Sequence, residues 1–546
     1  MPNLAGHLFR QAQERPGKIA LIDRGRPHTF GEIRDSVARA AGGLRSIDVG
    51  RDTKLGIMLS SRFEFIILQQ ATFALGGTFT PLNIHYRASE ILHALTSCEL
   101  EILVIEAGFH DRLPPDIASL CPCLRRIVLL DWDGLDWDGG ATDRSLMIAA
   151  EPLLTAEPIA APVDMPGDSL GLMLSTSATT GKAKGVMLSI ANIQSNYDAT
   201  PAWLGLSEPD TILCALPLYN TFGLNQCINA MMVTGCTLVL LPRFGVPAML
   251  EAIETYRPTF LPAVPTMLQK LLSDPETPGR DLRSIERILV GAAPVPGPLL
   301  ERIKDAMGRD VAVMQGYGLT EATAIVTIMR VETGPDGQPI KLRSVGQALP
   351  GIDMMIADES MTRLEPGMVG EICIRGPNVM RGYYKQLAET VAAVVDGWLR
   401  TGDLGTIDEE GYYYVVDRKK DVIIRGGQNI YPVDIEEVLY RCPSVAEAAV
   451  VAEPDPDLGE RPVAFVSVKP GERVDPEALR DRCRAELAYY KVPHRVVILP
   501  ELPKGPTGKI LRRDLRGVAP LPPWWLRLGI ATGPIKPSHQ QQSPTS

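Results

Sequence analysis

Long apolar runs, a surplus of basic residues and repeated close pairs of cysteines are all missing from this 546-residue sequence. No uncharged stretch approaches the about 20 residues that a helix needs to cross a bilayer. The first ten residues lack the basic and apolar segments of a secretory signal. A formal net charge of -10 argues against broad electrostatic binding of nucleic acid. These absences favour a cytoplasmic protein with no integral membrane contact and no nucleic-acid partner.

The cysteines are scattered, and only Cys121 and Cys123 form a close pair. No second pair completes a zinc site, so we interpret the cysteines as buried free thiols of a reducing compartment. The chain is longer than one hydrophobic core usually holds, which predicts two or more domains.

Short apolar runs alternate with helical repeats through the first 400 residues. Thr29 and Glu32 have the spacing of a capping box, which predicts a helix after residue 29. Helical periodicity recurs at 249–256. Buried strands are predicted at 54–59, 101–105, 211–215, 237–241 and 287–290. This alternation predicts an α/β domain with substantial parallel sheet.

The pattern changes after about residue 400. A strand-like run at 411–416 precedes the charged cluster 417–421, and Asp475 with Pro476 has the pattern of a helix start. We therefore predict a large domain over 1–416, a hinge at 417–421 and a small α+β domain over 422–516. The Pro- and Gln-rich segment 517–546 is expected to be a tail without its own core.

The segment 174–185 has the composition of a phosphate-binding loop. It packs five hydroxyl residues, two glycines and two lysines into twelve positions directly after an apolar run. It is not a Walker loop, because Thr176 and Ala183 occupy the positions of the first glycine and the closing hydroxyl residue. A flexible connector is the alternative reading of the segment taken alone.

The segment 315–321 begins like a dinucleotide fingerprint. Glu321 stands where the third glycine is required, so the sequence does not favour NAD binding. A carboxylate beside the Thr320 hydroxyl suits Mg²⁺ better.

Together these segments resemble the acyl-CoA synthetase, luciferase and peptide-synthetase adenylation superfamily over about residues 10–516. The matching pieces occur in the family's order at 77–83, 174–185, 216–223, 291–294, 315–321, 370–376, 398–403, 417–418, 490–493 and 503–509. The resemblance implies a large multi-subdomain adenylate-forming domain followed by a small mobile domain. It also implies ATP, Mg²⁺ and either coenzyme A or a carrier-protein phosphopantetheine as reactants or cofactors.

The resemblance assigns roles to individual residues of this sequence. The β- and γ-phosphates of ATP would lie among Thr176, Ser177, Thr179, Thr180, Gly181 and Lys184. The adenine pocket would be lined by Gly291, Ala292, Ala293, Pro294, Gln315, Gly316 and Tyr317. Thr320 would contact the α-phosphate, Glu321 would hold Mg²⁺, and Asp403 assisted by Arg418 would bind the ribose hydroxyls.

Lys509 is the implied catalytic lysine of acyl-AMP formation. Two anions, the substrate carboxylate and the triphosphate, must approach each other, and a positioned cation offsets their repulsion. The small domain would then swing about Lys420, so that Gly426 and Gly427 face the thiol channel in place of Lys509.

The expected acyl pocket departs from the family pattern. It would be formed by Tyr219, Asn220, Phe222, Gly223, Val264, Gly318 and Leu319, with Gly291 and Gly316 as small floors. Asn220 replaces the usual histidine and cannot become a cation near neutral pH. Ala178 and Ala183 replace the usual glycine and proline of the phosphate loop.

No acidic residue occurs at 213–224 to bind an α-ammonium group, so an aliphatic or aryl acid without an α-amino group is expected. The thiol acceptor would be coenzyme A. Three alternatives remain: a ligase that loads an acyl carrier protein, a catalytically weakened interaction protein on the same fold, and a luciferase-type oxygenase. The sequence does not indicate an oligomeric state.

Overall fold

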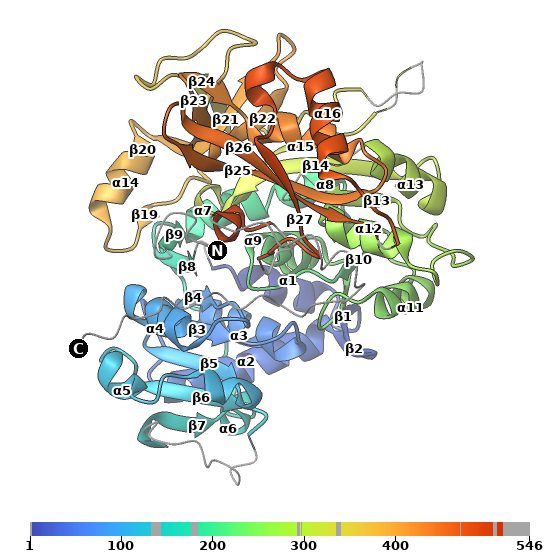
Figure 1. The fold of residues 1–546 in the computed structure, drawn as a ribbon. Helices are drawn as coiled ribbons and strands as arrows, with labels where there is room; N and C mark the ends of the chain where they lie inside the picture. The colour runs from blue at the N-terminus through green and yellow to red at the C-terminus, as the bar shows by residue number, and fades with distance from the viewer. Residues whose placement is uncertain are drawn as a thin grey trace, which may run out of the picture. The chain divides into compact units, whose positions relative to one another are not determined.

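A computed structural model describes residues 3–132, 144–175, 184–291, 295, 297–332, 334, 340–469, 471–505 and 510–516. The chain divides into two compact units, Met1–Val415 and Val416–Ser546 (Figure 1). Within the described ranges, no helix is both long and apolar enough to cross a membrane.

Two large mixed sheets form the framework of the first unit. Among the described residues, one sheet has the strand order β16-β15-β14-β13-β12-β10-β11-β1-β2 and the other the order β19-β9-β8-β4-β3-β5-β6-β7. The strands of the first are β1 (Ile19–Asp23), β2 (Arg26–Thr29), β10 (Thr211–Cys214), β11 (Thr237–Leu240), β12 (Phe260–Ala263), β13 (Arg287–Val290), β14 (Ala312–Leu319), β15 (Ala324–Arg330) and β16 (Gln347–Ala348). Those of the second are β3 (Lys54–Met58), β4 (Thr78–Pro81), β5 (Ile102–Glu106), β6 (Arg126–Leu130), β7 (Met147–Ala149), β8 (Leu170–Ser175), β9 (Gly185–Ser189) and β19 (Gly382–Tyr383).

A smaller antiparallel sheet completes the first unit, with the order β17-β18-β21-β20. Its strands are β17 (Asp353–Ala357), β18 (Gly370–Arg375), β20 (Val394–Val395) and β21 (Trp398–Ile407). Strand β22 (Tyr413–Arg418) pairs with β21 and runs across the division between the units.

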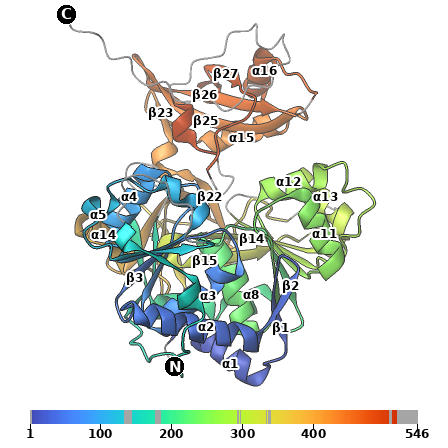
Figure 2. The same cartoon turned by 90° about the horizontal axis from the view of Figure 1, so that it is seen from below.

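Helices cover both faces of the large sheets. They are α1 (Gly6–Glu14), α2 (Phe30–Ser46), α3 (Phe63–Ala74), α4 (Ala88–Ser97), α5 (Ile117–Leu120), α6 (Glu151–Leu154), α7 (Ile190–Tyr197), α8 (Thr200–Leu204), α9 (Thr221–Gly223), α10 (Ala230–Thr234), α11 (Val246–Tyr256), α12 (Pro265–Ser273), α13 (Gly297–Met307) and α14 (Leu387–Ala393). Figure 2 shows α1, α2, α3 and α8 between the two strand groups, with α11, α12 and α13 together at the outer side. Short 3-10 helices lie at Ala107–Arg112, Arg144–Leu146 and Thr320–Ala322, and a π-helix lies at Leu224–Asn229.

The secondary structure predicted from the sequence is confirmed. Helix α2 begins with the predicted capping box of Thr29 and Glu32. The five predicted strands correspond to β3, β5, β10, β11 and β13, and they pair largely in parallel. Such strands are buried on both faces, which is why they appear in the sequence as continuous apolar runs.

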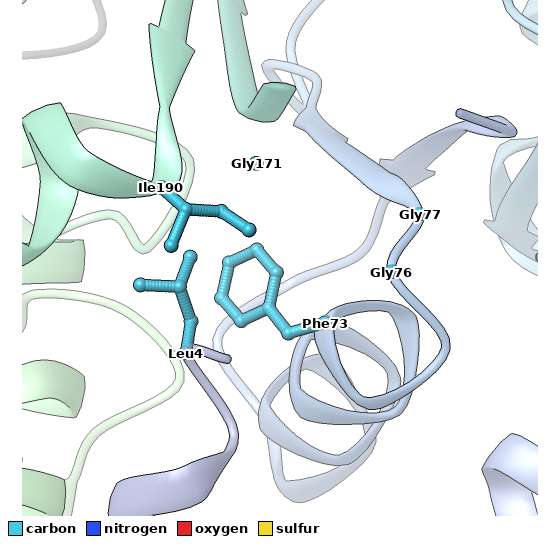
Figure 3. Close-up of a pocket in the computed structure, with 6 residues that line it drawn as sticks. All are labelled: Leu4, Phe73, Gly76, Gly77, Gly171 and Ile190. Atoms are coloured by element: carbon cyan, nitrogen blue, oxygen red, sulfur yellow. The ribbon is translucent and has the colours of Figure 1, made fainter. Parts of the chain in front are cut away.

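Gly77, which opens the first family-like segment, lies beside a small apolar void of about 10 Å³. Figure 3 shows the side chains of Leu4, Phe73 and Ile190 converging there. A Cβ on Gly77 would lie 3.1 Å from Thr72 Cγ2 and 3.2 Å from the Thr53 carbonyl oxygen, and both contacts are tighter than a Cβ usually makes. The glycine therefore serves core packing.

The second unit has its own sheet and core. Its described strands are β23 (Ile423–Arg425), β24 (Gln428–Ile430), β25 (Val445–Asp455), β26 (Gly459–Val468) and β27 (Arg495–Ile498), in the order β24-β23-β26-β25 with β27 beside β26. Helices α15 (Pro432–Tyr440) and α16 (Pro476–Glu486) pack on it, and 3-10 helices lie at Lys419–Asp421, Tyr489–Lys491 and Arg512–Leu515. As predicted, the Asp475 side chain caps α16 by accepting from the Glu477 amide.

Candidate functional site

Four predicted nucleotide residues of the first unit lie at or just beyond the point where the parallel pairing of β13 with β14 ends: Gly291, Gln315, Gly316 and Tyr317. These strands pair in register from Arg287 opposite Ala312 to Val290 opposite Gln315. Gly291 therefore follows β13 beside the second half of β14. The carboxyl ends of parallel strands are a common place for ligands because the connecting loops diverge there.

The side chain of Gln315 forms hydrogen bonds with the backbone of neighbouring loops. Its amide nitrogen donates to the carbonyl oxygens of Leu342 (2.6 Å) and Ser344 (3.0 Å), and its amide oxygen accepts from the Val295 amide (3.1 Å). The side chain thus fixes the loops on either side of β14. Its predicted place in the adenine pocket stays a prediction.

Tyr317 and Asp403 meet although 86 residues separate them in the chain. The Tyr317 hydroxyl donates to the Asp403 carboxylate at 2.7 Å, and Asp403 is only 4% exposed. Strand β14 positions the tyrosine and β21 the aspartate. A fixed carboxylate of this kind has acceptor capacity for hydroxyl groups such as those of a ribose.

Glu321 and Lys184 are brought together by a residue that the sequence analysis did not single out. The Tyr383 hydroxyl donates to the Glu321 carboxylate at 3.1 Å, and the Lys184 ammonium nitrogen lies 4.7 Å from the centroid of the same ring. Burial and the neighbouring Glu321 charge raise the pKa of Tyr383, which keeps its hydroxyl a donor. A carboxylate and an ammonium group are therefore organised around one tyrosine.

Strand pairing explains this arrangement. Strand β9 begins directly after Lys184, and β19 pairs with it so that Tyr383 lies opposite Val186. The Glu321 carbonyl also accepts from the Met380 amide at 2.8 Å, just before β19. No local sequence pattern marks Tyr383, because its place beside Glu321 depends on this strand pairing.

Two strained residues follow the 3-10 turn that carries Thr320 and Glu321. Thr323 (φ 54°) and Ala324 (φ 83°) both have left-handed backbone conformations, which are rare for β-branched and alanine side chains. Asn378 holds the turn through two hydrogen bonds. Its side-chain amide donates to the Ala322 backbone carbonyl (2.9 Å), and its backbone carbonyl accepts from the Thr323 hydroxyl (2.6 Å). Such strain persists only where the surroundings fix it, and it often occurs at functional sites.

Gly316 and Gly318 are explained by the approach of β15. A Cβ on Gly318 would lie 1.6 Å from the Ala324 carbonyl oxygen, and one on Gly316 would lie 2.8 Å from Ile325 Cδ1. The backbone of β15 excludes a side chain at Gly318, whereas at Gly316 the Ile325 side chain would have to shift. The predicted contact of Gly316, Gly318 and Leu319 with an acyl group stays a prediction.

Two of the predicted acyl pocket residues, Phe222 and Val264, lie close to Gly291. A Cβ at Gly291 would stand 2.9 Å from the Phe222 ring, so the ring packs over that backbone. Val264 follows β12 and is buried, and the Gly291 amide donates to the carbonyl of Ala263 in the same segment. Tyr219 is also buried, which raises its pKa. Gly223 is buried, and Asn220 is partly exposed just before α9.

In the second unit, Arg418 ends β22 and Lys420 is exposed on the following 3-10 turn. Gly426 (φ 56°) and Gly427 (φ 78°) form the tight turn between β23 and β24, where both positions favour glycine. This turn geometry accounts for the glycine pair. Their assignment to a thiol channel stays a prediction.

The segment that follows the position of Lys509 is tied to this unit by Arg512, which donates to both Glu436 carboxylate oxygens (2.7 and 2.8 Å). Arg512 also lies 3.9 Å from Asp417. Burial raises the pKa of Asp417 to about 6, although Arg512 and two backbone amides oppose that shift.

Several predicted site residues lie outside the residues that the structure describes. They are Thr176, Ser177, Thr179, Thr180, Gly181, Ala292, Ala293, Pro294 and Lys509.

Comparison with known proteins gives matches over almost the whole chain. The profile of the AMP-binding enzyme family matches residues 8–384, and that of the AMP-binding enzyme C-terminal domain matches 434–509. Feruloyl-CoA synthase of Amycolatopsis sp is 34% identical over 510 residues, which cover 93% of this chain and 97% of that protein. The 2-succinylbenzoate–CoA ligase of Bacillus subtilis is 34% identical over 511 residues, with the same coverage.

The solved structure of o-succinylbenzoate coenzyme A synthetase from Bacillus subtilis with ATP and magnesium ion is also similar. It has a TM-score of 0.80 and 32% identity, and the match covers 93% of this chain and 98% of that one.

Proposed function

The chain belongs to the AMP-binding enzyme family, and on that premise we propose that the carboxyl ends of β13 and β14 hold ATP and a carboxylic acid without an α-amino group. The chain is an acid–thiol ligase that forms acyl-CoA in an ATP-dependent reaction through acyl-AMP. One observation supports the placement most strongly: Glu321 and Lys184 flank Tyr383 beside the strained turn after β14.

The Lys184 ammonium group and the Glu321 carboxylate beside Tyr383 suit the binding of a polyphosphate and its metal counter-ion. Lys184 supplies a positive charge for phosphate oxygens, which an ammonium group binds as a point charge. Glu321 supplies the carboxylate for a cation, and Thr320 lies next to it in the chain. Asp403, held by the Tyr317 hydroxyl, accepts from the ribose hydroxyls with Arg418 as its assistant.

The Glu321 carboxylate fits Mg²⁺. In the described ranges, no group of three or more His, Cys, Asp or Glu side chains is arranged so that it could hold a metal ion. Mg²⁺ commonly takes one or two carboxylates and completes its shell with phosphate oxygens and water. When bound, the ion offsets phosphate charge.

The chemistry has two steps. The substrate carboxylate oxygen attacks the α-phosphorus and the bond to pyrophosphate breaks, which leaves acyl-AMP. A thiolate then attacks the acyl carbonyl, and AMP leaves with the bonding electrons. We assign Lys509 to the first step, because a cation offsets the repulsion between the two anions and the charge that develops at phosphorus. Gly426 and Gly427 are assigned to the second step, in which coenzyme A accepts the acyl group. Lys420 is assigned as the residue about which the small domain swings between the two steps.

The acid is aliphatic or aryl. Tyr219, Phe222 and Val264 give the pocket an apolar lining, and no acidic residue at 213–224 is available for an α-ammonium group. Asn220 presents a neutral amide to the carboxylate end of the substrate, so binding there does not depend on protonation of this residue.

The test is acid-dependent release of pyrophosphate across a panel of aliphatic, aryl and amino acids, first with coenzyme A and then with a carrier-protein thiol. We expect release with aliphatic or aryl acids and none with amino acids. Glu321→Gln should reduce it by about a hundredfold or more, as for other losses of electrostatic stabilisation.

Glu99→Gln is the matched control, because Glu99 also accepts from a tyrosine hydroxyl (Tyr384, 2.8 Å) and has no assigned role in the reaction. Equal losses in Glu321→Gln and Glu99→Gln would contradict the placement of the site. No acid-dependent pyrophosphate from any acid would contradict the proposed function.

A further inference from the structure

Strand β21 forms a bulge opposite β18 over residues 401–403. On one side of the bulge Glu371 pairs with Leu404, and on the other Cys373 pairs with Arg400. One residue of β18 and three of β21 lie between these pairs, and the third of the three is the carboxylate assigned to the ribose. Bulges are frequent beside active sites, where they redirect a side chain. The conformation of this bulge therefore decides where that carboxylate points.

Side chains take the place of β18 as hydrogen-bond partners of the bulge. The Gly402 amide donates to Glu371 Oε1 at 3.0 Å, and the Asp403 amide donates to the Thr401 hydroxyl at 3.1 Å. Gly402 has a left-handed backbone (φ 72°), which favours glycine. Backbone amides that leave a sheet ladder need such replacement partners. Glu371 thus fixes the backbone directly before Asp403.

Glu371 is itself held firmly. It is 6% exposed, and its Oε2 accepts from Arg400 Nε at 3.1 Å and from Arg400 Nη2 at 2.7 Å. Charge-assisted hydrogen bonds from a guanidinium group are strong and fix the orientation of the carboxylate. One oxygen of Glu371 is therefore anchored while the other holds the Gly402 amide. The Asp403 carboxylate is constrained from another side by the Tyr317 hydroxyl, at 2.7 Å.

We propose that Glu371 is a positioning residue for ATP. By holding the Gly402 amide it sets the direction of the Asp403 carboxylate, and so determines how strongly the ribose hydroxyls are bound. This inference rests on the proposed function, in which Asp403 accepts from those hydroxyls. Hydrogen bonds weaken steeply when they are misaligned. A small change in the bulge therefore weakens the ribose contacts and leaves the phosphate contacts unaffected.

The test measures the KM for ATP, 2′-deoxy-ATP and 3′-deoxy-ATP in the wild type and in Glu371→Gln. Pyrophosphate release is followed at a saturating concentration of one accepted acid. Glutamine has the shape of glutamate, but its NH₂ group must face either Arg400 or the Gly402 amide. Both of these are donors, so one of the two contacts is lost in either orientation.

In Glu371→Gln, we expect the KM for ATP to rise by about tenfold, as for the loss of a hydrogen bond to a charged group. The KM for the acid should stay near that of the wild type, and kcat should change less than the KM for ATP. The KM for each deoxy nucleotide should rise less, because it has one hydroxyl fewer to lose, so the preference for ATP should shrink. In an Asp403→Asn background, Glu371→Gln should change this preference no further, because both substitutions act on the same contact.

Asp353→Asn is the matched control. It removes another carboxylate–guanidinium contact of the same sheet, from Arg375 to Asp353 at 2.9 Å, between the paired strands β17 and β18. We expect its three KM values to stay near those of the wild type. If Glu371→Gln is not recovered in a folded form, Arg400→Lys takes its place, because lysine keeps the charge but not the two-pronged contact. It should show the same shift in a smaller amount.

Three results would overturn the inference. They are a wild type with no preference for ATP over the deoxy nucleotides, an unchanged KM and preference in the Glu371 or Arg400 variant, and an equal rise of KM for all three nucleotides. The last of these would indicate a general structural role. In each case pyrophosphate is still released, so the proposed function stands. No acid-dependent pyrophosphate from the wild type would remove the proposed function and this inference together.

Discussion

Removal of the Tyr383 hydroxyl tests the geometry around Glu321 most sharply. Tyr383→Phe deletes the donor to the Glu321 carboxylate and keeps the ring over which Lys184 lies. Hydrogen bonds to charged groups contribute about 1.5–3 kcal/mol, which corresponds to roughly ten- to a hundredfold in rate. We therefore expect kcat/KM for acid-dependent pyrophosphate release to fall by about that factor.

The role of Tyr383 is one of positioning, so a second readout is needed. Because the hydroxyl orients the carboxylate assigned to Mg²⁺, the Mg²⁺ concentration for half-maximal rate should rise in Tyr383→Phe. Tyr383→Leu also removes the ring beneath Lys184, and the loss of this cation–π contact should add a few-fold decrease. The rate should therefore fall strongly from the wild type to Tyr383→Phe and only a few-fold more from Tyr383→Phe to Tyr383→Leu.

Tyr384→Phe is the matched control. It deletes an equivalent hydrogen bond from the next residue in the chain, from the Tyr384 hydroxyl to Glu99 at 2.8 Å. We expect its kcat/KM and its Mg²⁺ dependence to stay near those of the wild type. The reasoning is refuted if Tyr383→Phe behaves like the wild type, or if the two phenylalanine variants lose activity equally.

Three further predictions concern other parts of the chain. Lys509→Ala should stop acyl-AMP formation, with a loss of about a hundredfold or more, and should spare thiol transfer from supplied acyl-AMP; equal loss of both half-reactions would count against its role. Tyr317→Phe frees Asp403 from its hydroxyl partner and should raise the KM for ATP about tenfold with a smaller effect on kcat, measured by ATP titration; an unchanged KM would remove Asp403 from the nucleotide site. The pKa of Asp417 is about 6 in the folded state against 3.8 ordinarily, so the folded state binds more protons between these values. The stability that this group contributes should therefore fall as pH rises towards 6 and stay level above it. Urea unfolding from pH 4 to 7 should show that slope in the wild type and a weaker one in Asp417→Asn.

The sequence predicted local structure well where one short segment contains the whole signal. The capping box of Thr29 and Glu32 and the cap at Asp475 need only neighbouring residues, and both are present. Parallel strands buried on two faces leave apolar runs that are visible without any knowledge of their partners.

Features that depend on contacts between residues far apart in the sequence could not be predicted in this way. Tyr383 meets Glu321 only because β19 pairs with β9, an arrangement that no local pattern encodes. Glu371 resembles any charged residue of a strand until its burial and its contacts with β21 are known. Gly318 looks like part of a ligand loop, yet the approach of Ala324 is sufficient to require it.

The most direct test of the account is the product balance of a complete reaction. With ATP, Mg²⁺, coenzyme A and an acid selected from the panel, the account predicts one AMP, one pyrophosphate and one acyl-CoA for each acid consumed. When coenzyme A is withheld, acyl-AMP should remain on the enzyme in at most stoichiometric amounts. Formation of ADP and phosphate, or of acyl-CoA without AMP, would contradict the account.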